Sequence, residues 1–393
     1  MSHGPKRGAI ELGKVGREIA VGRTKVVFVL GTRPEAIKLA PVVLQGRGAP
    51  TLDCALLCTG QHREMVDQAL RIFSLTPDVD LNIMKHGQDL ADLTAALMVE
   101  IDRYIKQRRP DLVVVQGDTT TAYSAAQVAF YNRVPVAHVE AGLRTWNKHA
   151  PFPEEINRVF ISRVSDIHFA PTASARENLL KEGVNGARIY VTGNTIVDAL
   201  NIILPDIAVS PPNIPELPKS VLLHSSPTVL ITGHRRESWG YGLRQVCEAV
   251  RELASTFLEV SFVYPVHLNP KVSETVSVCL GRLRNVHLIR PLDYRELIHL
   301  MSLSDLIISD SGGIQEEAPS LGKPVLVTRE FTERPEGVEI GAAVLVGCNT
   351  KRIVTEASRR LMECRPQAGS PRAANPYGDG RAAERIIEVL ESY

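Results

Sequence analysis

The chain has few aromatic residues and almost no net charge. Phe, Trp and Tyr make up 5% of its 393 residues, and 45 Lys and Arg stand against 44 Asp and Glu, for a formal net charge of +1. A chain so balanced has no global field that attracts nucleic acid or an anionic membrane. The shortage of aromatic side chains also argues against a stacking platform for single strands. We therefore expect neither nucleic acid nor a membrane among its partners.

Cysteines and long apolar runs are scarce too. The six cysteines include no C-x-x-C pair, which favours buried free thiols in a reducing compartment over disulfides or a zinc site. No apolar run is long enough to cross a bilayer. Residues 1–25 carry basic side chains without the apolar core of a signal peptide. These features predict a soluble cytoplasmic protein that needs no metal.

Several familiar site motifs are missing. There is no G-x-G-x-x-G at the first helix and no G-x-x-x-x-G-K-[ST], so tightly bound NAD and a P-loop NTPase are both disfavoured. The chain also lacks G-x-S-x-G and H-E-x-x-H, the signatures of one type of serine hydrolase and of zinc proteases. We expect no cofactor.

What the chain does have is a regular alternation of short β-branched runs and longer helical patterns. This alternation predicts parallel sheets with helices on both faces. The length suits two domains, and the Pro- and Ser-rich stretch 205–227 marks the break. We predict an α/β protein with two Rossmann-like doubly wound domains, residues 24–204 and 205–375, and a C-terminal helix within 376–393 that packs back on the first domain. The expected strands are Lys25–Leu30, Leu52–Cys58, Asp111–Val115, Val136–Val139, Ile167–Ala170, Ile189–Thr192, Thr228–Thr232, Val260–Tyr264, Val286–Ile289, Leu306–Ser309, Val325–Thr328 and Ala343–Val346.

The most informative stretch is Ser309–Pro324, where an apolar strand runs into the small residues Ser311–Gly313 and then a helical pattern. Unpaired N–H groups at a helix start carry partial positive charge and can seat a phosphate, and glycines allow a ligand to approach the backbone. Glu316 and Glu317 follow one turn later, where a carboxylate can accept from ribose hydroxyls. The pattern suggests a nucleotide or nucleotide-sugar site; an ordinary capped strand–helix junction explains it about as well.

Basic side chains follow other predicted strands, and ligands of open α/β sheets bind beyond such strand ends. Arg33 and Lys38 come after the first strand and would project toward a pyrophosphate. His234 stands beside two arginines, a setting that suits a diphosphate. Arg334 supplies one more cation for a phosphate or a base. The simpler alternatives are solvated side chains for the first two and a turn salt bridge for Arg334.

Acidic side chains occupy equivalent positions in the first half. Asp118 is either a helix cap or a catalytic acid or base. Glu140 ends a buried strand, where an unpaired carboxylate is costly, so it has either a chemical role or a salt bridge to Arg144 or Arg158. Glu154 follows Pro153, the expected first helical residue, and an i,i+4 pair of Glu154 with Arg158 explains it structurally.

Nine segments together resemble the non-hydrolysing bacterial type of the UDP-N-acetylglucosamine 2-epimerase family. Each is weakly specific alone, whereas the ordered set is highly specific. The segments are Gly31–Pro41, Thr59–Met65, Gln116–Ala122, His138–Thr145, Pro151–Arg158, Gly193–Asp198, Gly233–Ser238, Tyr264–Pro270 and Ser309–Pro324. The resemblance implies the glycosyltransferase-B architecture, an active site in the cleft between the two domains, and a homodimer.

The resemblance also implies a reaction and roles for individual residues. The reaction is reversible C2 epimerisation of UDP-N-acetylglucosamine to UDP-N-acetylmannosamine, by elimination and re-addition of UDP, for cell-surface polysaccharide precursors. Catalytic roles fall on Asp118, Glu140, Glu154 and His234. Substrate-binding roles fall on Arg33, Lys38, Arg158, Ser311, Gly312, Gly313, Glu317 and Arg334. A second UDP-N-acetylglucosamine is implied as an allosteric activator, with Gln61, Glu64, Arg235 and His267 as candidates, although Ala96 stands where the family usually has Arg.

Other functions stay open at this point. A hydrolysing epimerase would release UDP and free N-acetylmannosamine, and Gln61 and His267 favour the non-hydrolysing branch over it. A glycosyltransferase of the same architecture would need an acceptor, and the acidic residues of the first domain argue against it. A non-catalytic nucleotide-sugar sensor and an epimerase for a related diacetamido-uronate are the remaining alternatives.

Overall fold

The computed structural model describes residues 22–60, 63–84, 87–233, 240–363 and 375–393. The strands are β1 (Thr24–Leu30), β2 (Leu52–Cys58), β3 (Val79–Asp80), β4 (Leu112–Gln116), β5 (Val136–Val139), β6 (Ile167–Ala170), β7 (Ile189–Val191), β8 (Thr228–Thr232), β9 (Ser261–Pro265), β10 (Val286–Ile289), β11 (Leu306–Ser309), β12 (Val325–Val327) and β13 (Ala343–Leu345). The helices are α1 (Arg33–Gly48), α2 (Arg63–Ile72), α3 (Leu90–Arg108), α4 (Thr120–Tyr131), α5 (Glu154–Val164), α6 (Ala173–Lys181), η1 (Gly186–Arg188), α7 (Thr195–Val209), α8 (Lys219–Leu222), α9 (Tyr241–Thr256), α10 (Pro270–Leu280), α11 (Tyr294–Leu303), α12 (Gly312–Ser320), α13 (Pro335–Glu339), α14 (Thr350–Glu363) and α15 (Ala382–Ser392).

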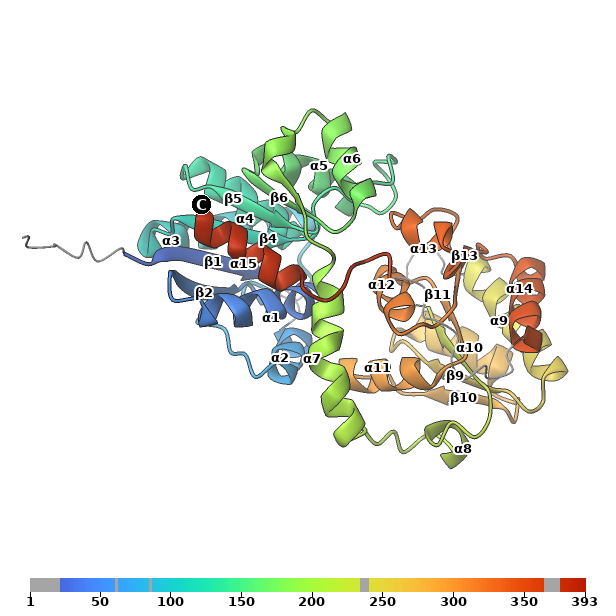
Figure 1. The fold of residues 1–393 in the computed structure, drawn as a ribbon. Coiled ribbons are helices and arrows are strands. Elements are labelled where there is room, and N and C mark those ends of the chain that lie inside the picture. The colour runs from blue at the N-terminus through green and yellow to red at the C-terminus, as the bar shows by residue number, and fades with distance from the viewer. Residues whose placement is uncertain (1–21, 61–62, 85–86, 234–239, 364–374) are drawn as a thin grey trace, which may run out of the picture.

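The strands of this part of the chain form two parallel sheets (Figure 1). The first has the order β3-β2-β1-β4-β5-β6-β7 and the second β10-β9-β8-β11-β12-β13. Each order reverses direction once, beside β1 and beside β8, which is the doubly wound pattern. The predicted α/β architecture is therefore confirmed, and every expected strand lies within one residue of its predicted bounds. Strand β3 was not predicted, because its two residues carry no periodic signal.

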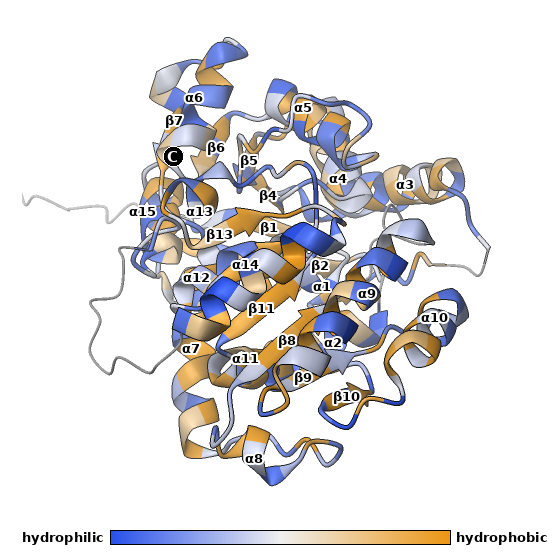
Figure 2. Ribbon diagram, turned by 90° about the vertical axis from the view of Figure 1, so that its right-hand side faces the viewer, coloured by the Kyte–Doolittle hydropathy of each residue, from blue (hydrophilic) through white to orange (hydrophobic). Residues whose placement is uncertain are grey.

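Apolar side chains cover both faces of the first sheet. In β1, Val26, Phe28 and Leu30 join the core on one face, while Val27 and Val29 join the core on the other. This period of two follows from the pleat of a strand, and helices on both sides bury both sets. Figure 2 shows β1, β8 and β11 as strongly hydrophobic. Burial of these strands holds their carboxyl ends, and the polar residues that follow them, in fixed positions.

Helix α7 connects the two halves, running between them in Figure 1. It packs against α1 and α15 on one side and against α11 and α12 on the other. Helix α15 buries Ile386 and Leu390 in the same core as α7. The Asp198 carboxylate of α7 accepts from the backbone N–H groups of Ala382 at 3.2 Å and Ala383 at 2.9 Å. These bonds satisfy two of the unpaired N–H groups at the start of α15 and tie the last helix to α7.

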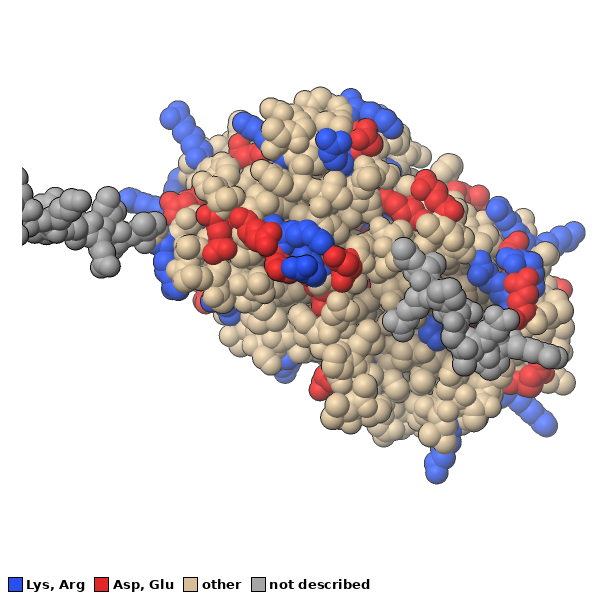
Figure 3. All heavy atoms as spheres, viewed as in Figure 1, with Lys and Arg blue, Asp and Glu red and all other residues tan. Residues whose placement is uncertain are grey.

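The surface and the cysteines test two compositional expectations. Basic and acidic side chains are interspersed over the face drawn in Figure 3. Within the described ranges, no helix combines the length and apolar character that a membrane span requires.

Of the five described cysteines, Cys58 and Cys247 are buried. The expectation of buried thiols thus fails for Cys54, Cys279 and Cys348, which are partly exposed.

Candidate active site

The strand, loop and helix around Ser311 form as the sequence predicts. β11 ends at Ser309 and α12 begins at Gly312, with Ser311 as the N-cap in an extended conformation (φ −77°, ψ 131°). A Cβ atom on Gly312 would lie 2.8 Å from Nη1 of Arg334, closer than a normal contact allows. The Arg334 guanidinium therefore lies against the first turn of α12, and a side chain larger than that of glycine at position 312 would displace it.

Arg334 is buried immediately before α13 and is held by two carboxylates. Its Nε donates to Oε1 of Glu316 at 2.6 Å, and its Nη1 donates to Glu333. Burial alone would lower the pKa of Arg334, but Glu316 and Glu333 raise the pKa well above its ordinary value. The guanidinium stays charged at the start of α12, where a phosphate is expected. Glu316, which the sequence suggested for a ribose, is instead an ion-pair partner inside the protein.

Lys38 lies in α1 between two carboxylates. Its Nζ donates to Glu140 at the end of β5 and lies 2.7 Å from Oε2 of Glu316 in α12. Burial would lower the pKa of Lys38, yet Glu140 and Glu316 raise it overall. The ammonium that the sequence pointed toward a pyrophosphate is engaged by acids from both halves of the protein.

Glu140 has a left-handed backbone, with φ at 65°. A residue with a Cβ atom adopts this conformation at a cost, and such strain is common at functional sites. Its carboxylate accepts from Lys38 and from Nδ2 of Asn194, the latter at 3.2 Å. Burial is the main cause that raises the pKa of Glu140, opposed by Lys38 and reinforced by Glu316. The site thus favours a proton on this carboxyl more than water does.

The expected salt bridge of Glu140 to Arg144 or Arg158 does not form. Arg144 instead reaches the two carboxylate oxygens of Glu182, with Nε at 2.6 Å and Nη2 at 2.9 Å. The chain turns at Gly142, whose φ is 94°, and this turn directs Arg144 to the end of α6. Arg158 pairs with other acids, so the purely structural explanation of Glu140 was wrong about its partner.

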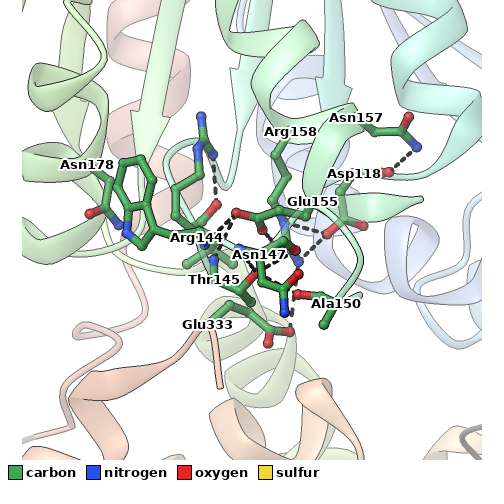
Figure 4. A network of polar contacts seen from close by, with 12 residues as sticks. Asp118, Arg144, Thr145, Asn147, Ala150, Glu155, Asn157, Arg158, Asn178 and Glu333 are labelled. Atoms are coloured by element: carbon green, nitrogen blue, oxygen red, sulfur yellow. Dashed lines mark hydrogen bonds and ion pairs between the residues drawn. The ribbon is translucent and has the colours of Figure 1, made fainter. Parts of the chain in front are cut away.

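Asp118 follows β4 and pairs with Arg158 (Figure 4). Arg158 reaches Oδ2 of Asp118 from Nε at 2.8 Å and from Nη2 at 2.6 Å. It also donates to Oε2 of Glu155 from Nη1 at 2.8 Å. Thr119 caps α4, because its side chain accepts from the N–H of Ala122 at 3.0 Å. The helix-cap explanation of Asp118 is therefore wrong, and its carboxylate is turned toward Arg158 instead.

Helix α5 begins one residue later than the sequence predicts. Pro153 is the N-cap and Glu154 the first helical residue. The ion pair from this turn to Arg158 is made by Glu155, at i,i+3. Glu155 also accepts from the backbone N–H groups of Thr145 and Trp146, both at 2.9 Å, so it fills the structural role that the sequence assigned to Glu154.

Neighbouring strands bring Asp118 and Glu140 to one edge of the first sheet. β4 pairs with β5 so that the residues just before these turns lie side by side, and a Cβ atom on Gly117 would lie 3.9 Å from Oε1 of Glu140. His138 Nε2 donates to the Gly117 carbonyl oxygen at 2.7 Å. Burial lowers the pKa of His138 to about 3. A neutral histidine thus holds the turn that carries Asp118.

The charged side chains join into one line that passes between the two halves. Nη2 of Arg158 lies 3.8 Å from Oε1 of Glu333, and this contact complements the one between Lys38 and Glu316. Apart from Asp118, the side chains of this set are at most 7% exposed, so removing one of them leaves an uncompensated buried charge, which is strongly destabilising. We call this set the interdomain charge network; its members are Asp118, Arg158, Glu333, Arg334, Glu316, Lys38 and Glu140.

Glu35 is a further buried acid that the sequence analysis missed. Its Oε2 accepts from the N–H of Gly31 at 3.0 Å, the N–H of Thr32 at 2.7 Å and the Thr32 hydroxyl at 2.8 Å, while its Oε1 accepts from Thr119 at 2.6 Å. Burial nevertheless raises the pKa of Glu35 to about 7. The T-x-x-E spacing from Thr32 is a capping-box signature that could have revealed it. Glu35 ties the β1–α1 loop to the turn beside Asp118.

Glu317 is a further buried acid of α12. Burial raises the pKa of Glu317 to about 7, and the neighbouring Tyr294 and the charge of Arg33 oppose that rise. The same guanidinium lowers the pKa of the buried Tyr294, which burial otherwise raises well above its usual range. Helix α1 lies close to α12, since Lys38 and Glu316 are 2.7 Å apart, as one ligand spanning both helices would need.

Of the four activator candidates, Glu64 and His267 lie within the described residues. Gln61, Arg235 and the catalytic candidate His234 lie outside the described part of the chain. Glu64 is exposed in the first turn of α2. His267 is exposed after β9, and its Nδ1 accepts from the backbone N–H of Asn269 at 3.1 Å.

The fold and the site define a two-domain α/β protein of the glycosyltransferase-B architecture, with a buried, charge-lined site where two Rossmann-like units meet. The profile of UDP-N-acetylglucosamine 2-epimerases matches residues 45–391. The chain belongs to this family.

Individual relatives agree with that assignment. The UDP-N-acetylglucosamine 2-epimerase of Salmonella typhimurium is 48% identical over 371 residues, which cover 94% of this chain and 99% of the relative. The crystal structure of the Neisseria meningitidis enzyme bound to UDP-GlcNAc has a TM-score of 0.87 at 44% identity, covering 94% of this chain and all of that one (100%). The Methanocaldococcus jannaschii enzyme, in complex with UDP-GlcNAc and UDP, has a TM-score of 0.80 at 33% identity, with coverage of 94% and 100%.

Proposed function

We propose that this protein interconverts UDP-N-acetylglucosamine and UDP-N-acetylmannosamine without hydrolysis, to supply precursors of cell-surface polysaccharide. The observation that carries the proposal is the arrangement of the interdomain charge network. Two acids from neighbouring strand ends of the first domain, Asp118 and Glu140, pair with Arg158 and Lys38 of the same domain. Through acids of the second domain the network reaches Arg334 and the start of α12. A nucleotide diphosphate sugar has the matching polarity, with an anionic pyrophosphate at one end and a sugar carbon to deprotonate at the other.

The chemistry follows from the substrate. No carbonyl acidifies C2 of the sugar, so direct removal of its proton would leave a poorly stabilised carbanion. If the C1–O bond to UDP breaks as a base takes the C2 proton, the electron pair forms a C1=C2 double bond and UDP leaves as an anion. UDP then adds back to C1, and a proton arrives at C2 from the other face. The reaction is redox-neutral and consumes nothing.

Roles within the site divide by charge. We assign proton handling to Asp118, Glu140 and Glu154, since acids on two sides of the sugar are needed, and to His234 an assisting role at the diphosphate. Fixed cations and N–H groups stabilise the leaving UDP most when they are preorganised; we assign this to Arg33, Lys38, Arg334 and the Ser311–Gly313 turn. Arg158 orients Asp118, and Glu317 accepts from the ribose.

Three broader features belong to the same proposal. We propose residues 24–204 and 205–375 as the two domains, with the segment 376–393 on the first. We propose a cytoplasmic homodimer. We also propose a second UDP-N-acetylglucosamine as activator, bound near Gln61, Glu64, Arg235 and His267.

The test of function is the product formed in heavy water. Incubation with UDP-N-acetylglucosamine should give UDP-N-acetylmannosamine that carries deuterium at C2, seen by ¹H NMR, with ³¹P signals of UDP-sugar retained. Accumulation of free UDP and N-acetylmannosamine would instead identify a hydrolysing enzyme. No deuterium at C2 would refute epimerisation.

The catalytic assignment is tested by Asp118→Asn. We expect this variant to bind UDP as the parent does, while turnover falls by about 10²–10⁴-fold, the usual contribution of an acid–base group. Asp111→Asn is the matched control, because Asp111 precedes the same strand at its opposite end and accepts from the N–H of Lys25 at 2.8 Å. Normal turnover in Asp118→Asn would remove that residue from the mechanism.

A further inference from the structure

One ammonium serves two carboxylates that come from different domains. Lys38, from the first domain, contacts Glu140 of its own domain and lies 2.7 Å from Oε2 of Glu316 of the second. Their side chains are between 1% and 7% exposed, so water does little to screen these charges. The negative charge of Glu316 therefore offsets part of the stabilisation that Lys38 gives to an ionised Glu140.

We propose that Glu316 is a positioning residue through which the second domain controls how tightly Glu140 holds its proton, by competing for Lys38. This inference rests on the proposed proton-handling role of Glu140. With the two domains together, Lys38 is shared and Glu140 also feels the negative charge of Glu316. When the second domain withdraws, Lys38 neutralises Glu140 alone and stabilises its ionised form.

The groups that face Glu140 come from four places in the fold. Lys38 lies in α1, Glu316 in α12, Arg334 before α13 and Asn194 before α7. After burial, the charges of Lys38 and Arg334 lower the pKa of Glu140, whereas that of Glu316 raises it. Arg334 is itself held by Glu316 and Glu333. Glu316 therefore pairs with both Lys38 and Arg334, the two cations that would otherwise stabilise an ionised Glu140.

The geometry limits what can change. Glu140 sits at the end of a fully buried strand and in a strained backbone conformation, so its carboxylate has little freedom. Lys38 has four rotatable side-chain bonds and can lean toward either acid. What changes is thus the distance of the second domain from Glu140, because Glu316 and Arg334 move together with that domain. Glu316 affects the pKa of Glu140 more than Arg334 does, so domain closure would favour a proton on Glu140.

The decisive variant is Glu316→Gln, which keeps the shape of the side chain and removes its charge. The pH at which Glu140 titrates should fall by about one pH unit or more, the usual effect of removing a close like charge. The limb of the kcat/KM profile that reports Glu140 should move to lower pH by the same amount. Glu336→Gln is the matched control: Glu336 is also a buried acid of the second domain that contacts the first, but its partner is Thr172, and the titration of Glu140 should stay where it is.

The titration of Glu140 is read directly by ¹³C NMR of the glutamate-labelled protein, with the signal identified by its loss in Glu140→Gln. A downward move of both the signal and the rate limb supports the inference. A move of the signal alone also supports it, and shows that the proposed catalytic role of Glu140 is wrong. An unchanged signal in Glu316→Gln overturns the inference.

A second variant covers the case in which Glu316→Gln does not fold. Glu316→Asp keeps the charge but withdraws it by one methylene, so Lys38 should lean toward Glu140 and the signal should move in the same direction by a smaller amount. Circular dichroism and binding of UDP establish that each variant is folded. An unchanged Glu140 signal in folded Glu316→Asp, with Glu316→Gln unfolded, likewise overturns the inference.

Discussion

Glu35→Gln should make the protein's stability less dependent on pH. The four groups that donate to Glu35 satisfy an ionised carboxylate, yet burial raises its pKa to about 7 from an ordinary 4.5. A protonated Glu35 can keep three of these bonds at Oε2 and turn its own O–H toward the Thr119 hydroxyl. Glutamine has the same arrangement, with its NH₂ in place of that O–H, so it imitates the protonated acid at every pH.

The sign and size follow from the two pKa values. Because the pKa of Glu35 is raised in the folded state, its stabilising contribution is complete below about pH 4.5 and is lost as the pH rises through about 7. The difference between the folded and unfolded pKa values of Glu35 corresponds to about 3 kcal/mol of unfolding free energy. About 2–3 kcal/mol of this is lost between about pH 5 and pH 8. The glutamine variant has no such loss.

The assay is urea unfolding of both proteins at pH 5 and at pH 8. At the lower pH the two free energies should agree within about 1 kcal/mol, the net worth of one hydrogen bond. At the higher pH the variant should have gained about 2–3 kcal/mol relative to the parent. If the difference between the two proteins is the same at both pH values, Glu35 does not titrate in this range and the reasoning is refuted.

Two further changes test the packing around the site. Asp198→Ala removes the acceptor for two N–H groups of α15, and should lower the free energy of unfolding by about 2 kcal/mol in urea, with a smaller loss for Asp198→Asn; equal stability of all three proteins would contradict this role. Gly312→Ala places a Cβ atom 2.8 Å from the Arg334 guanidinium. If Arg334 thereby loses one charge-assisted bond to UDP, worth about 1.5 kcal/mol, calorimetry should show UDP binding weakened about tenfold. Gly48→Ala is the control, since nothing lies within 4 Å of that added atom, and parent-like binding in Gly312→Ala would show that Arg334 is not displaced.

Local pattern was sufficient for the elements and for the edge of the sheet that carries the site. Fully buried strands such as β4 read as apolar runs, and a small-residue turn between β11 and α12 is visible in the letters alone. Since ligand sites lie beyond such strand ends, Asp118, Glu140 and Ser311 could be selected without coordinates. The capping-box spacing of Thr32 and Glu35 is equally local, so the position of Glu35 could also have been predicted from the sequence.

The partners of the charged residues could not be read in the same way. Glu140 was expected to meet Arg144 or Arg158, which are near in sequence, but it meets Lys38, which is 102 residues away. Glu316 looked like a ligand contact and proved to be the acid that joins Lys38 to Arg334. The first pair lies within one domain and the second joins the two domains, and in neither case does the spacing of residues along the chain determine the distance between them.

The amino-acid order by itself determined the two doubly wound sheets and which polar groups follow each strand, because hydrophobic period and turn chemistry are properties of a few consecutive residues. Only the tertiary structure decided which cation neutralises which acid. That choice depends on how α1 and α12 approach across the domain junction, and on a burial that makes each close charge felt strongly by its neighbours.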